Sequence, residues 1–305
     1  MTLRFTLLGP VGVTAHGSPV NVDRPRRRAV LAYLLLHANQ VVSVDQLAAA
    51  IWGVSPPSTA RAQIQSEIWA LRRSIQQADI ATEPIATQPG GYVLALAADQ
   101  LDLARYTTLT TTARVEGERG LLENACKLMR EALALWRGTP LSGAAADFVE
   151  PGRLHLEERR LADLEWLLGL ELTLGRHHEL IAELTRYVAE YPLRERLRTQ
   201  LMIALYRCGR QLEALRVARQ GCEMLADQHG LDPGPLLRDL ELAILRQDPK
   251  LDLDERAAPD GSATVTGTAL PGWRAERRPH AAARPDSTSR YAWTLSVVAR
   301  DSSSG

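Results

Sequence analysis

Apolar and polar residues alternate at the start of the chain in a way that predicts short strands. The stretches 3–8, "LRFTLL", and 11–14, "VGVT", flank a turn at Gly9-Pro10. The stretch 18–23, "SPVNVD", predicts a third strand, because short alternating runs bounded by Gly and Pro are typical of strands. A small N-terminal sheet is therefore expected.

Apolar spacing then changes to that of helices, and two helices have recognisable start and stop signals. The first is expected to run from Pro25, a favoured first-turn residue, to Asn39. The second begins at Ser43, which forms a capping-box pattern with Gln46, and ends at Gly53.

A third helix, which Ser58 or Thr59 is expected to cap, separates an apolar face from a slim polar one. Apolar residues recur at i, i+4, i+7 and i+11, which predicts one buried stripe of Ile64, Ile68, Leu71 and Ile75. The opposite face is expected to carry Gln63, Ser66, Glu67, Ala70 and Arg73. The borders of that face are expected at Gln65, Trp69 and Arg72.

A β-hairpin follows this helix and completes a known order of elements. Its arms are 85–87 and 92–94, and its tip is Pro89-Gly90-Gly91. Three helices followed by a hairpin predict a winged helix-turn-helix. A major groove about 12 Å wide admits one helix, in which Gln pairs with adenine, Arg with guanine and Glu with cytosine. The alternative is that this polar face is only a solvated helix surface.

The segment from 101 to 246 has an almost wholly helical pattern with an internal repeat. "LGRHHEL" at 174–180 and "CGRQLEA" at 208–214 place Gly175 and Gly209 34 residues apart, which is the tetratricopeptide period. About three helix pairs are expected to stack into a small solenoid. From residue 250 the chain is rich in Ala, Pro, Arg, Ser and Gly, which predicts a disordered tail.

Composition and charge add little to this picture. The 305 residues allow about two domains and carry no net charge, although residues 1–98 hold 8 Arg against 5 acidic residues. Cys126, Cys208 and Cys222 form no CxxC pair and are interpreted as small buried side chains. His177 and His178 are adjacent and point about 100° apart on a helix, so they are not expected to share a ligand set with a cysteine nearby in sequence, and no metal site is expected. No catalytic motif, signal peptide or membrane span is found, which predicts a soluble cytoplasmic protein that is not an enzyme.

The chain resembles the Streptomyces antibiotic regulatory proteins over about residues 1–249. The resemblance is carried by "LGPVGV" (8–13), "RPRRRAVLAYLLLHANQVVSVDQLAAAIWG" (24–53), "PPSTARAQIQ" (56–65), "PGGYVL" (89–94), "LDLARY" (101–106), "REALALWRGTPL" (130–141) and "GLDPGPLLRDLELAILRQDP" (230–249). It implies a mainly α protein with an OmpR-like winged helix at 1–98, a tetratricopeptide-like bacterial transcriptional activation domain at 99–249, and a tail at 250–305. Because no GxxxxGK[ST] occurs, a small-type member without a nucleotide cofactor is expected.

The resemblance also implies a function and partners. It implies an activator of a secondary-metabolite gene cluster that binds promoter direct repeats near the −35 region as a homodimer. It also implies recruitment of RNA polymerase through its sigma or alpha subunit, with the OmpR-type contact loop at Val54, Ser55, Pro56, Pro57 and Ser58. The predicted DNA-binding residues are Thr59, Arg61, Gln63, Gln65, Ser66, Glu67, Arg72, Arg73, Gly90, Gly91 and Tyr92.

One departure and one alternative accompany this prediction. Trp69 and Ala70 stand where the family usually has Ser and Arg, so the DNA sequence that is read is expected to differ. Arg26, Arg27 and Arg28 form either a solvated helix end or a set of phosphate contacts. The alternative function is a tetratricopeptide scaffold that binds protein and not DNA.

Overall fold

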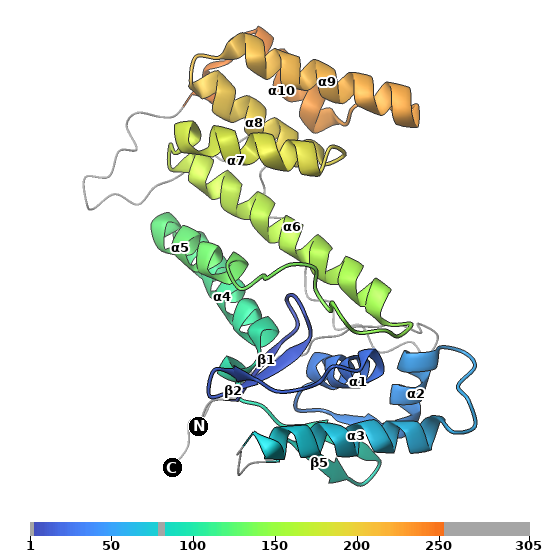
Figure 1. Ribbon diagram of the computed structural model, residues 1–305. Coiled ribbons are helices and arrows are strands. Elements are labelled where there is room, and N and C mark those ends of the chain that lie inside the picture. The colour runs from blue at the N-terminus through green and yellow to red at the C-terminus, as the bar shows by residue number, and fades with distance from the viewer. Residues whose placement is uncertain (1–2, 79–82, 253–305) are drawn as a thin grey trace. The chain divides into compact units, whose positions relative to one another are not determined.

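The computed structural model describes residues 3–78 and 83–252 and opens with the predicted small sheet (Figure 1). Strands β1 (Leu3–Thr6), β2 (Gly12–Ala15) and β3 (Ser18–Pro19) are antiparallel in that order. Leu3 and Phe5 are buried while Arg4 is exposed, as the strand period requires. All three predicted strands are present, but β1 ends at Thr6 and β3 at Pro19, short of the predicted limits at residues 8 and 23.

Three helices form the centre of the N-terminal region. They are α1 (Pro25–Leu36), α2 (Val44–Trp52) and α3 (Ala60–Gln77), and each packs on the other two. The predicted capping box is present: Ser43 Oγ accepts from Gln46 N at 3.0 Å, and Ser43 N donates to Gln46 Oε1 at 2.8 Å. Gly53 follows α2 with a φ of 65°, which glycine adopts without steric cost.

The first helix ends three residues earlier than predicted. Asn39 adopts a φ of 65° outside the helix. Its side-chain amide donates to Leu96 O at 3.0 Å and accepts from Leu96 N at 2.8 Å. These two bonds satisfy the backbone N–H and C=O of Leu96, so Asn39 binds the segment after β6 (Gly91–Leu94) and does not extend α1.

A second sheet joins the chain between α1 and α2 to the hairpin after α3. Strands β4 (Val41–Ser43), β5 (Ile85–Gln88) and β6 (Gly91–Leu94) pair antiparallel in the order β4-β6-β5. The predicted hairpin is therefore present, and β4 anchors its second arm. Figure 1 shows β5 alongside α3.

Seven α-helices fill the rest of the described chain (Figure 1). They are α4 (Asp102–Glu118), α5 (Leu122–Leu133), α6 (Val149–Thr173), α7 (His177–Glu190), α8 (Glu195–Arg207), α9 (Gln211–His229) and α10 (Pro235–Leu245), with short 3-10 turns at η1 (Ala98–Gln100) and η2 (Pro249–Leu251). Gly175 and Gly209 have φ of 82° and 74° between consecutive helices. The 34-residue repeat therefore corresponds to equivalent turns.

The helical core extends beyond the predicted start of the tail. Leu251 is only 2% exposed and belongs to an apolar cluster formed mainly by α6 to α10. Its carbonyl accepts from Arg207 Nε at 2.8 Å. The predicted start of the tail at residue 250 is therefore too early, because the ordered chain includes Leu251. The rest of the predicted tail, residues 253–305, lies outside the described residues.

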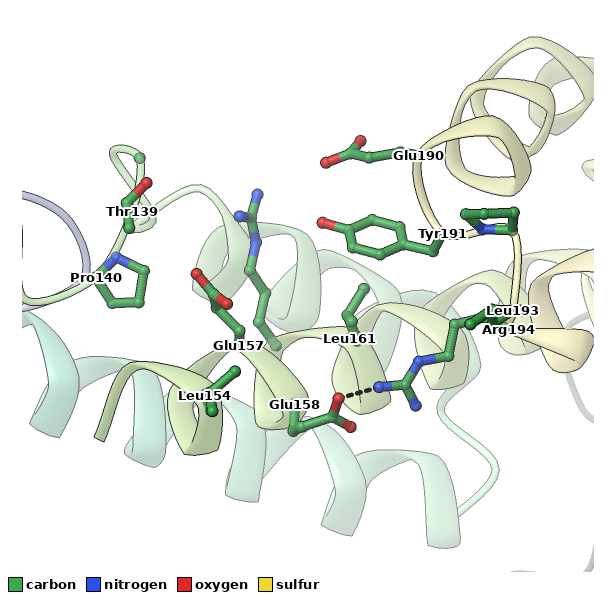
Figure 2. Close-up of a pocket in the computed structure, with 13 residues that line it drawn as sticks. Thr139, Pro140, Leu154, Glu157, Glu158, Leu161, Glu190, Tyr191, Leu193 and Arg194 are labelled. Carbon is green, nitrogen blue, oxygen red and sulfur yellow. Dashed lines mark hydrogen bonds and ion pairs between the residues drawn. The ribbon is translucent and has the colours of Figure 1, made fainter. Parts of the chain in front are cut away.

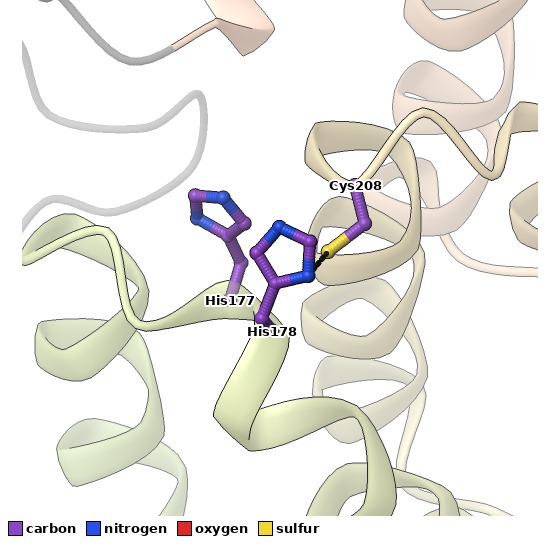
Figure 3. Close-up of side chains that lie close together, drawn as sticks. All are labelled: His177, His178 and Cys208. Atoms are coloured by element: carbon purple, nitrogen blue, oxygen red, sulfur yellow. Dashed lines mark hydrogen bonds between the residues drawn. The ribbon is translucent and has the colours of Figure 1, made fainter.

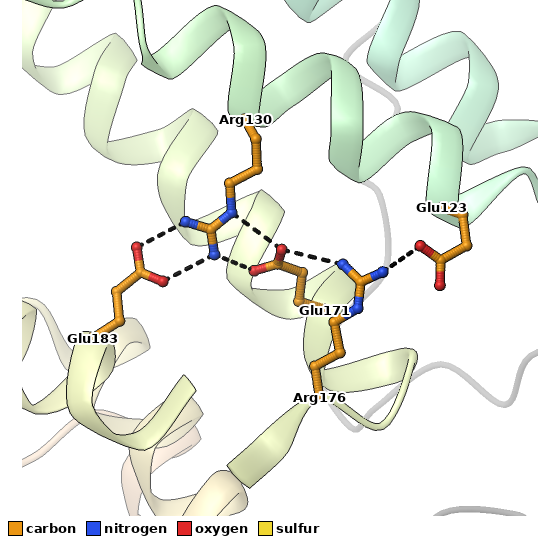
Figure 4. A network of polar contacts seen from close by, with 5 residues as sticks. All are labelled: Glu123, Arg130, Glu171, Arg176 and Glu183. Atoms are coloured by element: carbon orange, nitrogen blue, oxygen red, sulfur yellow. Dashed lines mark hydrogen bonds and ion pairs between the residues drawn. The ribbon is translucent and has the colours of Figure 1, made fainter. Parts of the chain in front are cut away.

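A charged network ties α5, α6 and α7 together (Figure 4). Glu171 is buried, and it bonds Arg130 Nη2 at 2.5 Å and Arg176 Nη1 at 3.5 Å. Arg130 also bonds Glu183, and Arg176 also bonds Glu123. Each arginine thus bridges two carboxylates, which compensates the burial of Glu171.

Candidate nucleic-acid interface

The exposed face of α3 is the candidate surface for a duplex groove. The helix buries Ile64, Ile68, Leu71 and Ile75 against its neighbours, as predicted. Its exposed side chains are Arg61, Ala62, Gln65, Ser66, Trp69, Arg73, Gln76 and Gln77. Trp69 is 59% exposed, and the guanidinium of Arg73 lies 5.1 Å from the centre of its ring.

Two residues predicted at the centre of this face are held against α1 instead. Glu67 Oε2 accepts from Arg27 Nε at 2.9 Å, and these two side chains are 13% and 15% exposed. Gln63 Oε1 accepts from Arg26 Nη1 at 2.8 Å. The exposed face is therefore centred on Gln65, Ser66 and Trp69, although the sequence predicts Gln65 and Trp69 at its borders.

The residue before α3 also differs from its expected role. Thr59 stands at the N-cap position, but its side chain makes no cap hydrogen bond. Its Oγ1 accepts from Gln63 Nε2 at 2.8 Å. The side-chain amide of Gln63 thus binds Arg26 through its oxygen and Thr59 through its nitrogen, and these two hydrogen bonds fix its orientation.

Arg72 joins the helix to the hairpin. Its Nε donates to Ile85 O at 3.0 Å and contacts Glu83 Oε1 at 2.7 Å, and its Nη2 donates to Thr87 Oγ1 at 2.8 Å. Its guanidinium also lies 5.9 Å from the ring centre of Tyr92. These contacts fix the hairpin relative to α3, so Arg72 positions the predicted wing.

The hairpin separates an exposed tip from a buried base. Gln88, Pro89 and Gly90 are exposed, and Gly90 has a φ of 95°. Gly91 belongs to β6, where an added Cβ would lie 2.0 Å from Val42 O. Tyr92 is only 8% exposed. The structure thus places Gly90 at the free tip, while Gly91 and Tyr92 build the base.

The predicted polymerase-contact loop follows α2, and the run of three arginines lies at the start of α1. Every residue of the predicted polymerase-contact loop, Val54 to Ser58, is exposed, and Val54 is 84% exposed. Arg26 lies 5.1 Å from the ring centre of the half-buried Trp52. Arg28 contacts Asp23 at 3.7 Å. The arginine run is thus partly used in internal contacts.

The helical region offers a cleft of a different kind (Figure 2). It has a volume of about 610 Å³ and lies between α6 and the turn that follows α7. Leu154 and Leu193 are 55% and 54% exposed at this cleft. Glu158 and Arg194 form an ion pair there. An exposed apolar pair with charged neighbours suits a protein segment better than a nucleic acid.

The three cysteines are free but not equally buried. Cys126 is buried, as predicted, and burial raises the pKa of its thiol to about 12. Cys208 and Cys222 are only half-buried: Cys208 follows α8, and Cys222 lies on α9, where it packs against the edge of the apolar cluster. In residues 3–78 and 83–252, no helix is both long and apolar enough to cross a membrane.

Comparison with known proteins divides the chain between two families. Residues 20–94 match the family described as transcriptional regulatory protein, C terminal, and residues 101–245 match the bacterial transcriptional activator domain. The chain is 40% identical over 271 residues to the regulatory protein AfsR of Streptomyces coelicolor, which covers 88% of this chain and 27% of AfsR. It is 35% identical over 259 residues to the regulatory protein DnrI of Streptomyces peucetius, covering 82% of this chain and 94% of DnrI.

A solved structure shares the fold. The structure of Mycobacterium tuberculosis EmbR in complex with a low affinity phosphopeptide has a TM-score of 0.76 and 39% sequence identity, covering 81% of this chain and 66% of that one. The chain thus spans about a quarter of AfsR and about two thirds of EmbR, but nearly all of DnrI.

Proposed function

The chain belongs to the Streptomyces antibiotic regulatory protein family of transcriptional regulators, and we propose that it activates a secondary-metabolite gene cluster by binding promoter DNA. In this proposal the winged helix binds direct repeats near the −35 region, and the bound protein recruits RNA polymerase. The domain limits 1–98 and 99–249 belong to the same proposal.

The observation that carries the proposal is the arrangement of α3. One side of the helix is fixed by four buried apolar residues, and Arg72 fixes the hairpin to it. The other side presents Gln65, Ser66 and Arg73, which have the hydrogen-bonding groups that read base edges. Gln63 and Glu67 are assigned a positioning role, because Arg26 and Arg27 already bind them.

Selection from random duplexes with the full chain, followed by gel-shift titration, tests the proposal. Ser66→Ala, Gln65→Ala and Arg73→Ala should each lose discrimination against a wrong base by about 1–3 kcal/mol. Arg219→Ala, at an exposed arginine on α9, is the matched control and should leave binding unchanged. If all three α3 variants select the same sequences as the parent with equal affinity, α3 is not the recognition helix.

Polymerase recruitment by the loop 54–58 has its own test. Val54→Asp changes the most exposed large apolar side chain among residues 3–78 and 83–252 without altering the core. It should bind the selected duplex normally but activate a reporter promoter less. Full activation by this variant would remove the loop from the proposal.

The cleft at Leu154 and Leu193 favours the second candidate, a protein-binding scaffold without DNA binding. The dependence of duplex binding on salt concentration distinguishes the two functions. A DNA-binding protein that neutralises several phosphates loses affinity steeply as salt rises, with a slope of about −0.9 per phosphate in log–log form. Absence of any salt-dependent duplex binding would favour the scaffold.

A further inference from the structure

Two turns of the helical repeat bring three metal-ligating side chains together (Figure 3). His177 and His178 begin α7, and Cys208 follows α8, thirty residues further along the chain. One ligand atom from each residue lies within 4.8 Å of the other two. The absence of a metal site predicted from the sequence is therefore wrong in its premise, because the repeat brings in a cysteine from the next turn and not from a position nearby in sequence.

The geometry of the three groups favours coordination. His178 Nδ1 lies 3.3 Å from Cys208 Sγ, and the two imidazole ring centres are 5.1 Å apart. His177 Nδ1 is buried and has no hydrogen-bond partner in the described chain. A buried imidazole nitrogen without a partner is costly unless something binds it, and it points to an additional ligand.

We propose that His177, His178 and Cys208 bind a divalent transition-metal ion of the Zn²⁺ class. Zinc bonds of about 2.0–2.1 Å to nitrogen and 2.3 Å to sulfur place tetrahedral ligands roughly 3.3–3.6 Å apart. The His178–Cys208 distance of 3.3 Å lies in this range, and the widest separation, which is at most 4.8 Å, must close by no more than roughly 1.2–1.5 Å through side-chain rotation. Two imidazoles and a thiolate exclude Mg²⁺ and Ca²⁺, which prefer oxygen ligands.

These side chains bind a metal ion only in their deprotonated forms. The Cys208 thiol releases its proton to solvent when the ion binds, and both imidazoles bind in the neutral form. Three protein ligands leave a fourth position open, which is typical of ions that exchange or take an outside ligand.

Binding would connect two consecutive repeat turns. The ion would tie the start of α7 to the end of α8, at positions one repeat apart next to Gly175 and Gly209. Because the ion binds the folded form, it should stabilise the helical region in proportion to its concentration. The site lies outside the winged helix and does not depend on the proposed DNA function.

Titration of the full chain with Co²⁺, and then with Zn²⁺ in competition, tests the site. The parent protein should show a thiolate-to-cobalt charge-transfer band and tetrahedral visible bands, both lost on adding Zn²⁺, and Zn²⁺ should raise its Tm. Cys208→Ser should abolish the charge-transfer band, and His177→Gln and His178→Gln should weaken affinity by at least about 100-fold, since even outer-shell changes cost 10–100-fold.

Cys222→Ser and His155→Gln are the controls. Cys222 is another half-buried free cysteine, and His155 lies on α6 outside the cluster, so both variants should bind Co²⁺ like the parent. Far-ultraviolet circular dichroism checks that every variant is folded. A parent without the thiolate band overturns the proposal, as does a band that survives Cys208→Ser or is lost in Cys222→Ser.

Discussion

At the scale of single residues, Glu67 either reads a DNA base or only holds Arg27 in position, and two substitutions distinguish these roles. Glu67→Ala leaves the Arg27 guanidinium, 15% exposed, without its carboxylate. We expect the free energy of unfolding to fall by about 1–3 kcal/mol, because a largely buried charged donor loses its acceptor. Glu67→Gln retains an acceptor for Arg27 and should cost less. Urea unfolding monitored by circular dichroism measures both variants.

The exposed pair Arg210–Glu213 is the control for this prediction. Its side chains are 44% and 47% exposed, so Glu213→Ala should change stability less than Glu67→Ala. A different result would reassign Glu67. If Glu67→Gln keeps full stability but changes the preferred base at one position of the selected duplex, Glu67 reads DNA directly.

Glu165 gives a prediction for pH dependence. Burial raises the pKa of this carboxyl above its ordinary value, partly offset by Arg196 and Arg194. The folded form therefore binds a proton more readily than the unfolded form, and stability falls as pH rises from the ordinary pKa through the raised one. Glu165→Gln should raise Tm at neutral pH and leave it unchanged at pH below the ordinary pKa. An equal shift at both pH values would assign the effect to packing.

The sequence predicted burial correctly where it follows from the geometry of a single helix. Ile64, Ile68, Leu71 and Ile75 share one face because of helical geometry alone, and all four are buried. The exposed face was predicted less well. Its centre depends on which side of α3 meets the arginines of α1, 37 to 40 residues away. Periodicity contains no information on that contact.

At the scale of elements, the hairpin depends on two adjacent glycines for different reasons. In Gly91→Ala the new Cβ would lie 2.0 Å from Val42 O, so β6 must separate from β4. In Gly90→Ala nothing lies within 4 Å of the new Cβ, and only the φ of 95° is unfavourable, at a cost of about 1–2 kcal/mol. We expect the larger loss of Tm for Gly91→Ala. Equal losses would show that β4 does not restrain the hairpin.

Element boundaries were predictable where the signal is local. The capping box at Ser43 and Gln46 and the glycine after α2 were identified from the sequence because each acts within a few residues. The end of α1 was not, because Asn39 bonds Leu96, 57 residues away. The metal-ligand cluster was missed for the same reason. The 34-residue repeat was the signal that could have paired Cys208 with the turn at His177.

At the scale of the molecule, contacts cross the predicted domain limit at residue 98. Asp102 accepts from Leu7 N at 2.9 Å and from Leu8 N at 3.1 Å. Asp102→Ala leaves both donors without this acceptor, and each unsatisfied donor should cost about 1–3 kcal/mol. Thermal unfolding of the full chain measures the loss. Asp99→Ala, at an exposed neighbouring acid, should have little effect. Unchanged Tm in Asp102→Ala would indicate that 1–98 and the helices fold independently.

The assembly on DNA gives the last prediction, which rests on the proposed function. Two protomers on a direct repeat are related by translation along the duplex, so the repeats should be spaced by about one helical turn, roughly 10–11 base pairs. An insertion of about 5 base pairs turns one site to the opposite face and should abolish cooperative binding, while an insertion of about 10 should partly restore it. Gel-shift titration of the full chain on the three duplexes measures cooperativity, and a duplex with one repeat gives the affinity of a single protomer. Equal affinity on all three spacings would mean that protomers bind independently, so a dimer on DNA would have to be abandoned even if α3 reads the bases.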